Sequence, residues 1–73
     1  MFKITDERGY TYYMTTANMP EYYRSFDEKL VGAVSFIRHE AEQGAWLKCY
    51  TDSMLRDVVA VRADEIYIVE EKK

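Results

Sequence analysis

Two alternating runs of β-prone residues, 2–5 and 10–15, flank a four-residue turn sequence and predict a hairpin at the start of the chain. The loop length decides which side chains share a face. A three-residue loop, 7–9, pairs Asp6 with Tyr10 and suits the local chemistry, because a type I turn favours Asp at its first position and Gly9 can adopt the left-handed conformation that follows. This register gathers on one face Phe2, Ile4, Tyr10, Tyr12 and Met14. A four-residue loop would mix polar and apolar residues on both faces.

The hairpin register also sorts a cluster of tyrosines. Residues 10–23 contain five of the seven tyrosines in the chain, and a buried tyrosine needs a partner for its hydroxyl group. We expect Tyr10 and Tyr12 to face the core. Tyr13 falls on the opposite face among lysine and threonine residues, so core packing does not account for it.

A helix is predicted after the hairpin. Asn18 can accept hydrogen bonds from the first free amides, Pro20 is tolerated in a first turn, and Glu21 is placed to complete a capping box. One apolar stripe follows at helical spacing, formed by Met19, Tyr23, Phe26 and Leu30. Tyr23 is therefore expected to point inward, and Tyr22 lies at the edge of the stripe.

The end of this helix has two interpretations. The apolar stripe can continue to a C-terminal cap at Gly44, which gives one long helix from which Phe36 projects away from the stripe. Alternatively, the helix ends near Gly32 and residues 33–40 form a strand that pairs with residues 45–51. The second interpretation rests on the apolar, β-prone residues at positions 34–37.

The last third of the sequence predicts strands. Residues 45–51 form one strand, residues 52–56 a connection, and residues 57–71 two strands or one bent strand around a turn at 62–65. Tyr67 lies between Ile66 and Ile68, outside the expected core pattern. The whole chain, 1–73, is predicted to be a single α+β domain with an antiparallel sheet of four to six strands and one amphipathic helix. A small open barrel is the alternative.

Composition limits the functional classes. Thirteen acidic and ten basic residues are mixed along the chain and give a net charge of −3, without the basic stripe that duplex binding requires. No apolar run reaches the length of a membrane span, and the first residues lack a signal-peptide pattern, so we expect a cytoplasmic protein that does not bind membranes. Because the single cysteine excludes an internal disulfide, self-association into a homo-oligomer is the expected way to stabilise so small a domain.

Catalytic and metal-binding motifs are absent from the sequence. One His and one Cys do not provide the three or four ligands of a zinc site, and the three glycines are too scattered for a phosphate loop. Cys49 with His39 is the one pair that resembles a nucleophile and its base, and each residue is better explained as an ordinary strand or surface position. The sequence therefore predicts no enzyme activity, no cofactor and no metal.

What remains is a set of aromatic residues outside the predicted core. Exposed aromatics are enriched at the centres of protein interfaces and also serve as platforms for stacked bases. We therefore predict a non-enzymatic protein-binding module with an accessory, regulatory or inhibitory role, and the candidate contact residues are Tyr13, Tyr22, Phe36 and Tyr67. The alternative is a small barrel that binds single-stranded nucleic acid. In length, acidity and its closing sequence, 63–71, the chain is similar in texture to small proteins of Gram-positive bacteria and their phages, which implies no residue roles.

Overall fold

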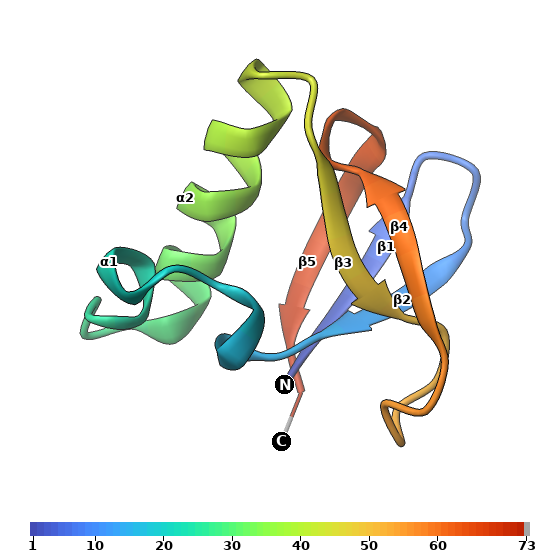
Figure 1. The fold of residues 1–73 in the computed structure, drawn as a ribbon, viewed down its shortest axis with the longest axis horizontal. Coiled ribbons are helices and arrows are strands. Elements are labelled where there is room, and N and C mark those ends of the chain that lie inside the picture. Colours follow the sequence, from blue (N-terminus) through green and yellow to red (C-terminus); the bar gives the residue numbers. More distant parts are fainter. Residues whose placement is uncertain (73) are drawn as a thin grey trace.

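The computed structural model describes residues 1–72 and contains one antiparallel sheet with a helical segment packed against one side (Figure 1). The elements in chain order are β1 (Phe2–Asp6), β2 (Thr11–Met14), the 3-10 turn η1 (Thr16–Asn18), α1 (Glu21–Arg24), α2 (Lys29–Glu42), β3 (Trp46–Tyr50), β4 (Val58–Arg62), the 3-10 turn η2 (Ala63–Glu65) and β5 (Ile66–Glu71). The strand order is β4-β3-β2-β1-β5. This confirms the predicted α+β class, and the sheet is open rather than closed into a barrel.

The hairpin has the predicted three-residue loop. Ile4 lies opposite Tyr12, and the Asp6 amide donates to the Tyr10 carbonyl at 3.0 Å. Gly9 has a φ of 89°, in the left-handed region that favours glycine. The local turn residues therefore fix the register, and with it the face on which every side chain of β1 and β2 lies.

The segment between the hairpin and β3 differs from both predicted forms. Residues 33–40 are helical, so the strand alternative is wrong, but the long continuous helix is also wrong because α1 and α2 are separate. The Ser25 hydroxyl donates to the Tyr22 carbonyl at 2.6 Å, and the Lys29 ammonium donates to the Arg24 carbonyl. These two side chains bond to carbonyls near the end of α1, which otherwise need a following helical turn.

Both ends of the helical segment have clear local causes. Contrary to the prediction, Asn18 does not cap α1. Its Oδ1 accepts the Thr15 amide at 2.9 Å within η1, and the extended backbone of Pro20 separates η1 from α1. At the other end Gly44 (φ 66°) ends α2 as predicted. Here Ala45 donates to the Glu40 carbonyl at 3.0 Å, which is the six-to-one bond of a Schellman motif.

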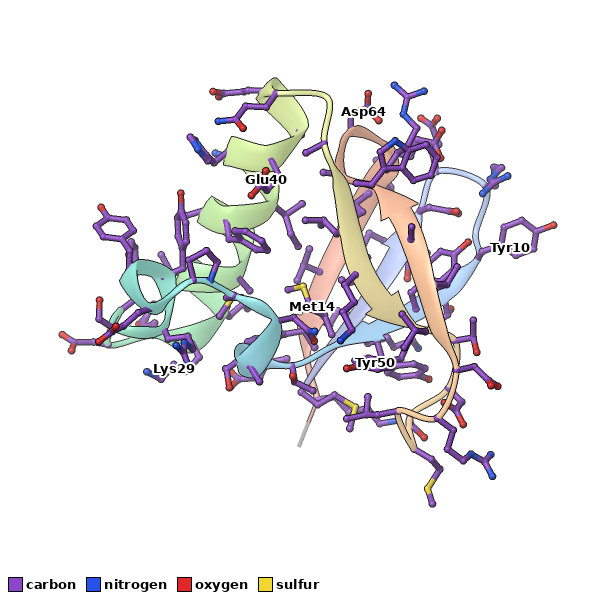
Figure 2. All side chains as sticks on the ribbon, in the orientation of Figure 1. Tyr10, Met14, Lys29, Glu40, Tyr50 and Asp64 are labelled. Atoms are coloured by element: carbon purple, nitrogen blue, oxygen red, sulfur yellow. The ribbon has the colours of Figure 1, made fainter. Side chains whose placement is uncertain are left out.

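The core lies between α2 and the face of the sheet that α2 covers. Met14 points into this space in Figure 2. The buried apolar residues are Phe2, Ile4, Met14, Met19, Ala33, Phe36, Ile37, Leu47, Cys49, Val61 and Ala63. Tyr12 and Tyr23 pack against this cluster, as predicted, with their side chains partly exposed.

Two residues were assigned to the wrong environment by the sequence. Tyr10 is 59% exposed because it lies at the tip of the hairpin, beyond the cover of α2, where Figure 2 shows it projecting from the body. Phe36 is buried rather than directed away from the core. The buried face of α2 comprises Gly32, Ala33, Phe36 and Ile37, so Phe36 lies one helical turn from Gly32 and Ala33, on the side that meets the core.

Candidate functional site

The face of the sheet opposite α2 is the surface that carries most of the unexplained aromatic and apolar side chains. Along β3, Leu47 and Cys49 are buried, and their neighbours in the sequence point to the other side. The same alternation holds in β1 and β4. We call this surface the outer face; its side chains belong to Lys3, Thr5, Thr11, Tyr13, Trp46, Lys48, Tyr50, Val58, Ala60, Arg62, Ile68 and Glu70.

One row of cross-strand neighbours runs across all five strands of the outer face. In sheet order it comprises Val58, Tyr50, Tyr13, Lys3 and Glu70. The row is apolar and aromatic at the β4 end and charged at the β5 end. Such neighbours have Cβ atoms about 4.5–5.5 Å apart, so they form one continuous surface rather than isolated side chains.

Trp46 is the most prominent side chain of the outer face. It is 63% exposed, lies opposite Arg62 and shares β3 with Tyr50. A large apolar ring that a monomer leaves in water forgoes burial worth about 2–3 kcal/mol, so its position is informative. Val58 and Ile68 are also exposed on this face. Among residues 1–72, the outer face therefore combines aromatic and aliphatic side chains outside the core.

Basic groups are interleaved with these rings. Lys48 Nζ lies 6.0 Å from the centroid of the Tyr50 ring, and Lys72 Nζ lies 5.2 Å from that of Tyr13. Both are within the range of a cation–π contact. Arg62, by contrast, is paired with Asp64 at 2.8 Å. On the strands of the outer face three cations, Lys3, Lys48 and Arg62, accompany one carboxylate, although the chain as a whole is acidic.

The four sequence-predicted contact residues do not share one site. Tyr13 lies at the centre of the outer face and is half-buried. Tyr22 is on α1, where its ring meets those of Tyr23 and Phe26 edge-on. Tyr67 is 77% exposed on β5, at the rim of a groove of about 190 Å³ beside α2. Phe36 is buried in the core and is not available for contact.

Sequence reasoning missed the residues that make the outer face continuous. From the sequence we predict strands that contain Trp46, Tyr50 and Val58, but not on which face of the sheet their side chains lie. The signal was present, because residues 46–50 and 58–62 alternate, and burying Leu47 and Cys49 leaves Trp46 outside. Only the register of Tyr13 against Tyr50 joins them to the hairpin, and no local pattern encodes that long-range pairing.

The proposed nucleophile pair is not assembled. Cys49 is buried on the inner face of β3, and burial raises the pKa of its thiol to about 11. His39 is exposed on α2, and its Nε2 lies 2.9 Å from the Gln43 side-chain nitrogen. A thiol without a base and with a raised pKa is a poor nucleophile. In the described part of the chain, no group of three or more metal-binding side chains occurs.

We expect Cys49 to resist alkylation in the folded protein. At pH 8 a pKa of about 11 in place of about 9 reduces the thiolate fraction about 100-fold, and burial slows access further. Mass spectrometry during iodoacetamide treatment should show slow modification in buffer and rapid modification in urea. Equal rates in both conditions would mean an accessible, reactive thiol and would reopen a catalytic role.

Among the helices of residues 1–72, none is both long and apolar enough to cross a bilayer. Comparisons of the chain with protein-family models, with curated proteins and with solved structures find no match. The similarity in texture to small bacterial and phage proteins therefore gains no support from any matched protein.

Proposed function

We propose that this protein is a non-enzymatic binding module that acts as an accessory, regulatory or inhibitory protein by docking a partner protein on its outer face. The observation that carries the proposal is the exposure of Trp46 beside the continuous row through Tyr50 and Tyr13. Tryptophan and tyrosine dominate the energetic centres of protein interfaces, where a few buried rings provide most of the affinity.

The aliphatic side chains favour a protein partner. Val58 and Ile68 are exposed at opposite ends of the outer face, on β4 and β5, and flank the aromatic centre. Aliphatic groups of this kind gain stability by leaving water for an apolar surface and offer nothing to a phosphate backbone. An apolar and aromatic centre with charged residues around it is the usual anatomy of a protein interface.

The charge of the outer face indicates the chemistry of the partner. Lys48 and Lys72 sit over tyrosine rings and form no ion pair within the described residues, so their charges are available to a partner. Complementarity then calls for a partner surface with an apolar centre and carboxylates placed near these lysines. Such pairs speed association and set orientation more than they add affinity.

A second candidate function rests on the same two lysine–tyrosine contacts. Aromatic rings interleaved with cations form the platform on which single-stranded nucleic acid stacks, at about 1–3 kcal/mol per base. In this hypothesis bases would stack on Tyr13, Tyr50 and Trp46. It gives Val58 and Ile68 no role. Binding by this mode would weaken steeply with salt.

The test compares what wild type and single variants retain from the lysate of the source organism, with and without nuclease treatment. Trp46→Ala should weaken capture of the partner about 30-fold or more, since loss of a central ring costs about 2 kcal/mol or more. Tyr22→Ala and Tyr67→Ala are the matched controls, because both remove an exposed ring that lies off the outer face. Thermal melts confirm that each variant is folded.

Three results would separate the candidates. A partner lost with Trp46→Ala, retained by both controls and unaffected by nuclease supports the proposal. Capture that is lost with Tyr22→Ala or Tyr67→Ala and kept by Trp46→Ala would place the contact elsewhere and refute the outer face as the site. Capture that disappears after nuclease treatment, together with salt-sensitive binding of a single-stranded oligonucleotide, would replace the protein partner with nucleic acid.

A further inference from the structure

Strand β4 forms one edge of the sheet, and its far side is open. In the described chain β3 is its neighbour in the sheet, with Lys48 paired opposite Ala60. Figure 1 shows β4 (orange) beside β3, its one neighbour in the strand order of the described chain. The exposed backbone of an edge strand is a template on which another strand can pair.

The phase of the ladder shows which backbone groups face the open side. Ala63 donates to the Ala45 carbonyl, and Thr51 donates to the Asp57 carbonyl. In an antiparallel pair, hydrogen-bonded and non-hydrogen-bonded positions alternate, so the odd-numbered residues of β4 bond to β3. The N–H and C=O groups of Val58 and Ala60 and the N–H of Arg62 therefore point away from β3, while the Arg62 carbonyl begins the 3-10 turn η2.

The two edges of the sheet are protected to different degrees. Strand β5 carries a bulge opposite Thr5 and Asp6, ends in Glu70 and Glu71, and lies against α2. Bulges, charges and covering elements are the usual devices that prevent edge pairing. Strand β4 has an unbroken register with β3, and its sequence Val-Val-Ala-Val-Arg contains one charge. It is the unprotected edge.

The β4 sequence is complementary to itself about Ala60. Antiparallel pairing of two copies with Ala60 opposite Ala60 places Val58 opposite Arg62 and Val59 opposite Val61. Val58, Ala60 and Arg62 of each copy then all fall at hydrogen-bonded positions, so the register uses every residue of the strand that faces the open edge. A shift by two residues would lose one of these three pairs. The side chains agree, because the partly exposed Val59 gains the buried Val61 of the other copy as its neighbour.

Charge does not oppose this arrangement. Arg62 already pairs with Asp64 at 2.8 Å, and in the symmetric register the two Arg62 positions are four residues apart along the strands, about 13 Å. That separation exceeds the screening length of about 8–10 Å at physiological salt. We propose that two copies of the chain pair antiparallel through β4, with Ala60 on the two-fold axis, to form one continuous sheet.

The dimer does not require the proposed partner, but it enlarges the surface on which that partner would dock. It joins the outer faces of both copies into a single surface, so that Trp46 and Val58 of each copy lie near the centre. It also supplies additional buried area to a domain that has too few residues for a large core.

Site-specific cross-linking tests the register directly. Residues opposite each other at a hydrogen-bonded position have Cα atoms about 5.5 Å apart, within the reach of a disulfide, so Ala60→Cys should form covalent dimers in a glutathione buffer. Lys48→Cys is the matched control, because three strand spacings separate its two copies by about 14 Å. The buried Cys49 does not interfere. We expect Ala60→Cys to cross-link at least tenfold faster; equal rates would overturn the register.

Charge substitution on the axis provides a second test in solution. Ala60→Lys and Ala60→Glu each place like charges opposite one another and should be monomeric, while an equimolar mixture should restore dimers. Ala60→Pro should also abolish association, because it removes an outward N–H that the monomer does not use. Sedimentation equilibrium measures the association of the three variants and of the Lys–Glu mixture. A wild-type protein that stays monomeric up to about 1 mM, or a mixture that does not associate, would refute the dimer.

Discussion

Replacement of Gly32 by alanine is expected to destabilise the protein by about 2–4 kcal/mol, although alanine is the better helix former. Gly32 is buried in the first turn of α2, directly against α1. A Cβ at this position would overlap the carbonyl oxygen of Tyr23 and lie 3.4 Å from the Cβ of Phe26. A backbone carbonyl cannot rotate aside as a flexible side chain can, so α1 itself must move.

The direction of the change in unfolding free energy distinguishes a glycine packed against α1 from an exposed helical glycine. In an exposed helix the change from Gly to Ala would stabilise by about 1 kcal/mol, whereas overpacking against a fixed backbone costs about 1–3 kcal/mol or more. Displacing α1 also disturbs Tyr23, whose ring centroid lies 5.4 Å from that of Phe36. The loss is large relative to the stability of about 3–5 kcal/mol that such a small core provides.

Urea unfolding followed by circular dichroism measures the change. Val31→Ala is the control, because Val31 is the exposed neighbour in the same turn and its truncation should alter stability by less than about 0.5 kcal/mol. If Gly32→Ala is as stable as wild type or more stable, α1 does not pack onto α2 at this point and the described helical arrangement is incorrect.

Local sequence chemistry was sufficient for the hairpin. The positions of Asp6 and Gly9 select the three-residue loop, and that loop fixes every pair from Phe2–Met14 to Asp6–Tyr10. The same is true of the C-terminal cap at Gly44. In each case the determining contacts lie within a few residues, and the conformation requires a residue type that the sequence visibly supplies.

The break between α1 and α2 could not be read in the same way. The stripe from Met19 to Leu30 continues the helical period across residues 25–28, so periodicity alone favours a continuous helix. What interrupts it is a tertiary contact, the close approach of the Tyr23 backbone to Gly32, together with two side chains that bond to the carbonyls of α1. Phe36, which the periodicity directs away from the stripe, is buried on α2.

The candidate site was predictable only in part, for a related reason. Tyr13 was identified from the hairpin register alone, and its membership of a larger surface depends on the pairing of β2 with β3. These strands are separated in sequence by the whole helical segment. A short chain with one sheet can reach such a pairing in several ways, and the apolar pattern of Trp46 to Tyr50 is compatible with more than one of them.

The outer face and the β4 edge are linked by geometry. Residues of β4 with outward-facing backbone groups, Val58, Ala60 and Arg62, are the same residues whose side chains belong to the outer face. A partner bound on the face would therefore contact the strand that carries the proposed two-fold axis. Partner affinity and self-association should therefore be coupled, so partner binding by the wild type and by the monomeric Ala60→Pro variant should differ.

Replacement of Asp6 by alanine is expected to lower the melting temperature by roughly 10 °C, because one buried carboxylate organises the hairpin loop. Its Oδ1 accepts the amides of Arg8 at 3.0 Å and Tyr10 at 2.9 Å, and its Oδ2 accepts the Arg8 guanidinium at 3.2 Å. The Tyr12 hydroxyl approaches the same oxygen at 3.5 Å. Asp6→Asn keeps the shape and one acceptor oxygen, so its loss should be smaller.

The dependence on pH separates the charge of Asp6 from its shape. Burial desolvates the carboxylate and by itself raises its pKa, but hydrogen bonds from the Tyr10 amide and from Arg8 outweigh this and hold the pKa below its ordinary value of 3.8. The folded state then binds fewer protons than the unfolded state, so this stabilisation is complete above about pH 4 and is lost as pH falls through the folded pKa.

Melting curves of wild type and Asp6→Asn should converge at low pH. A constant difference down to about pH 2 would show that the loop depends on shape and not on the charge. Hydrogen bonds donated by Arg56 also lower the pKa of Asp52. Its protonation therefore lowers the stability of both proteins equally at acid pH and leaves the comparison between them unchanged.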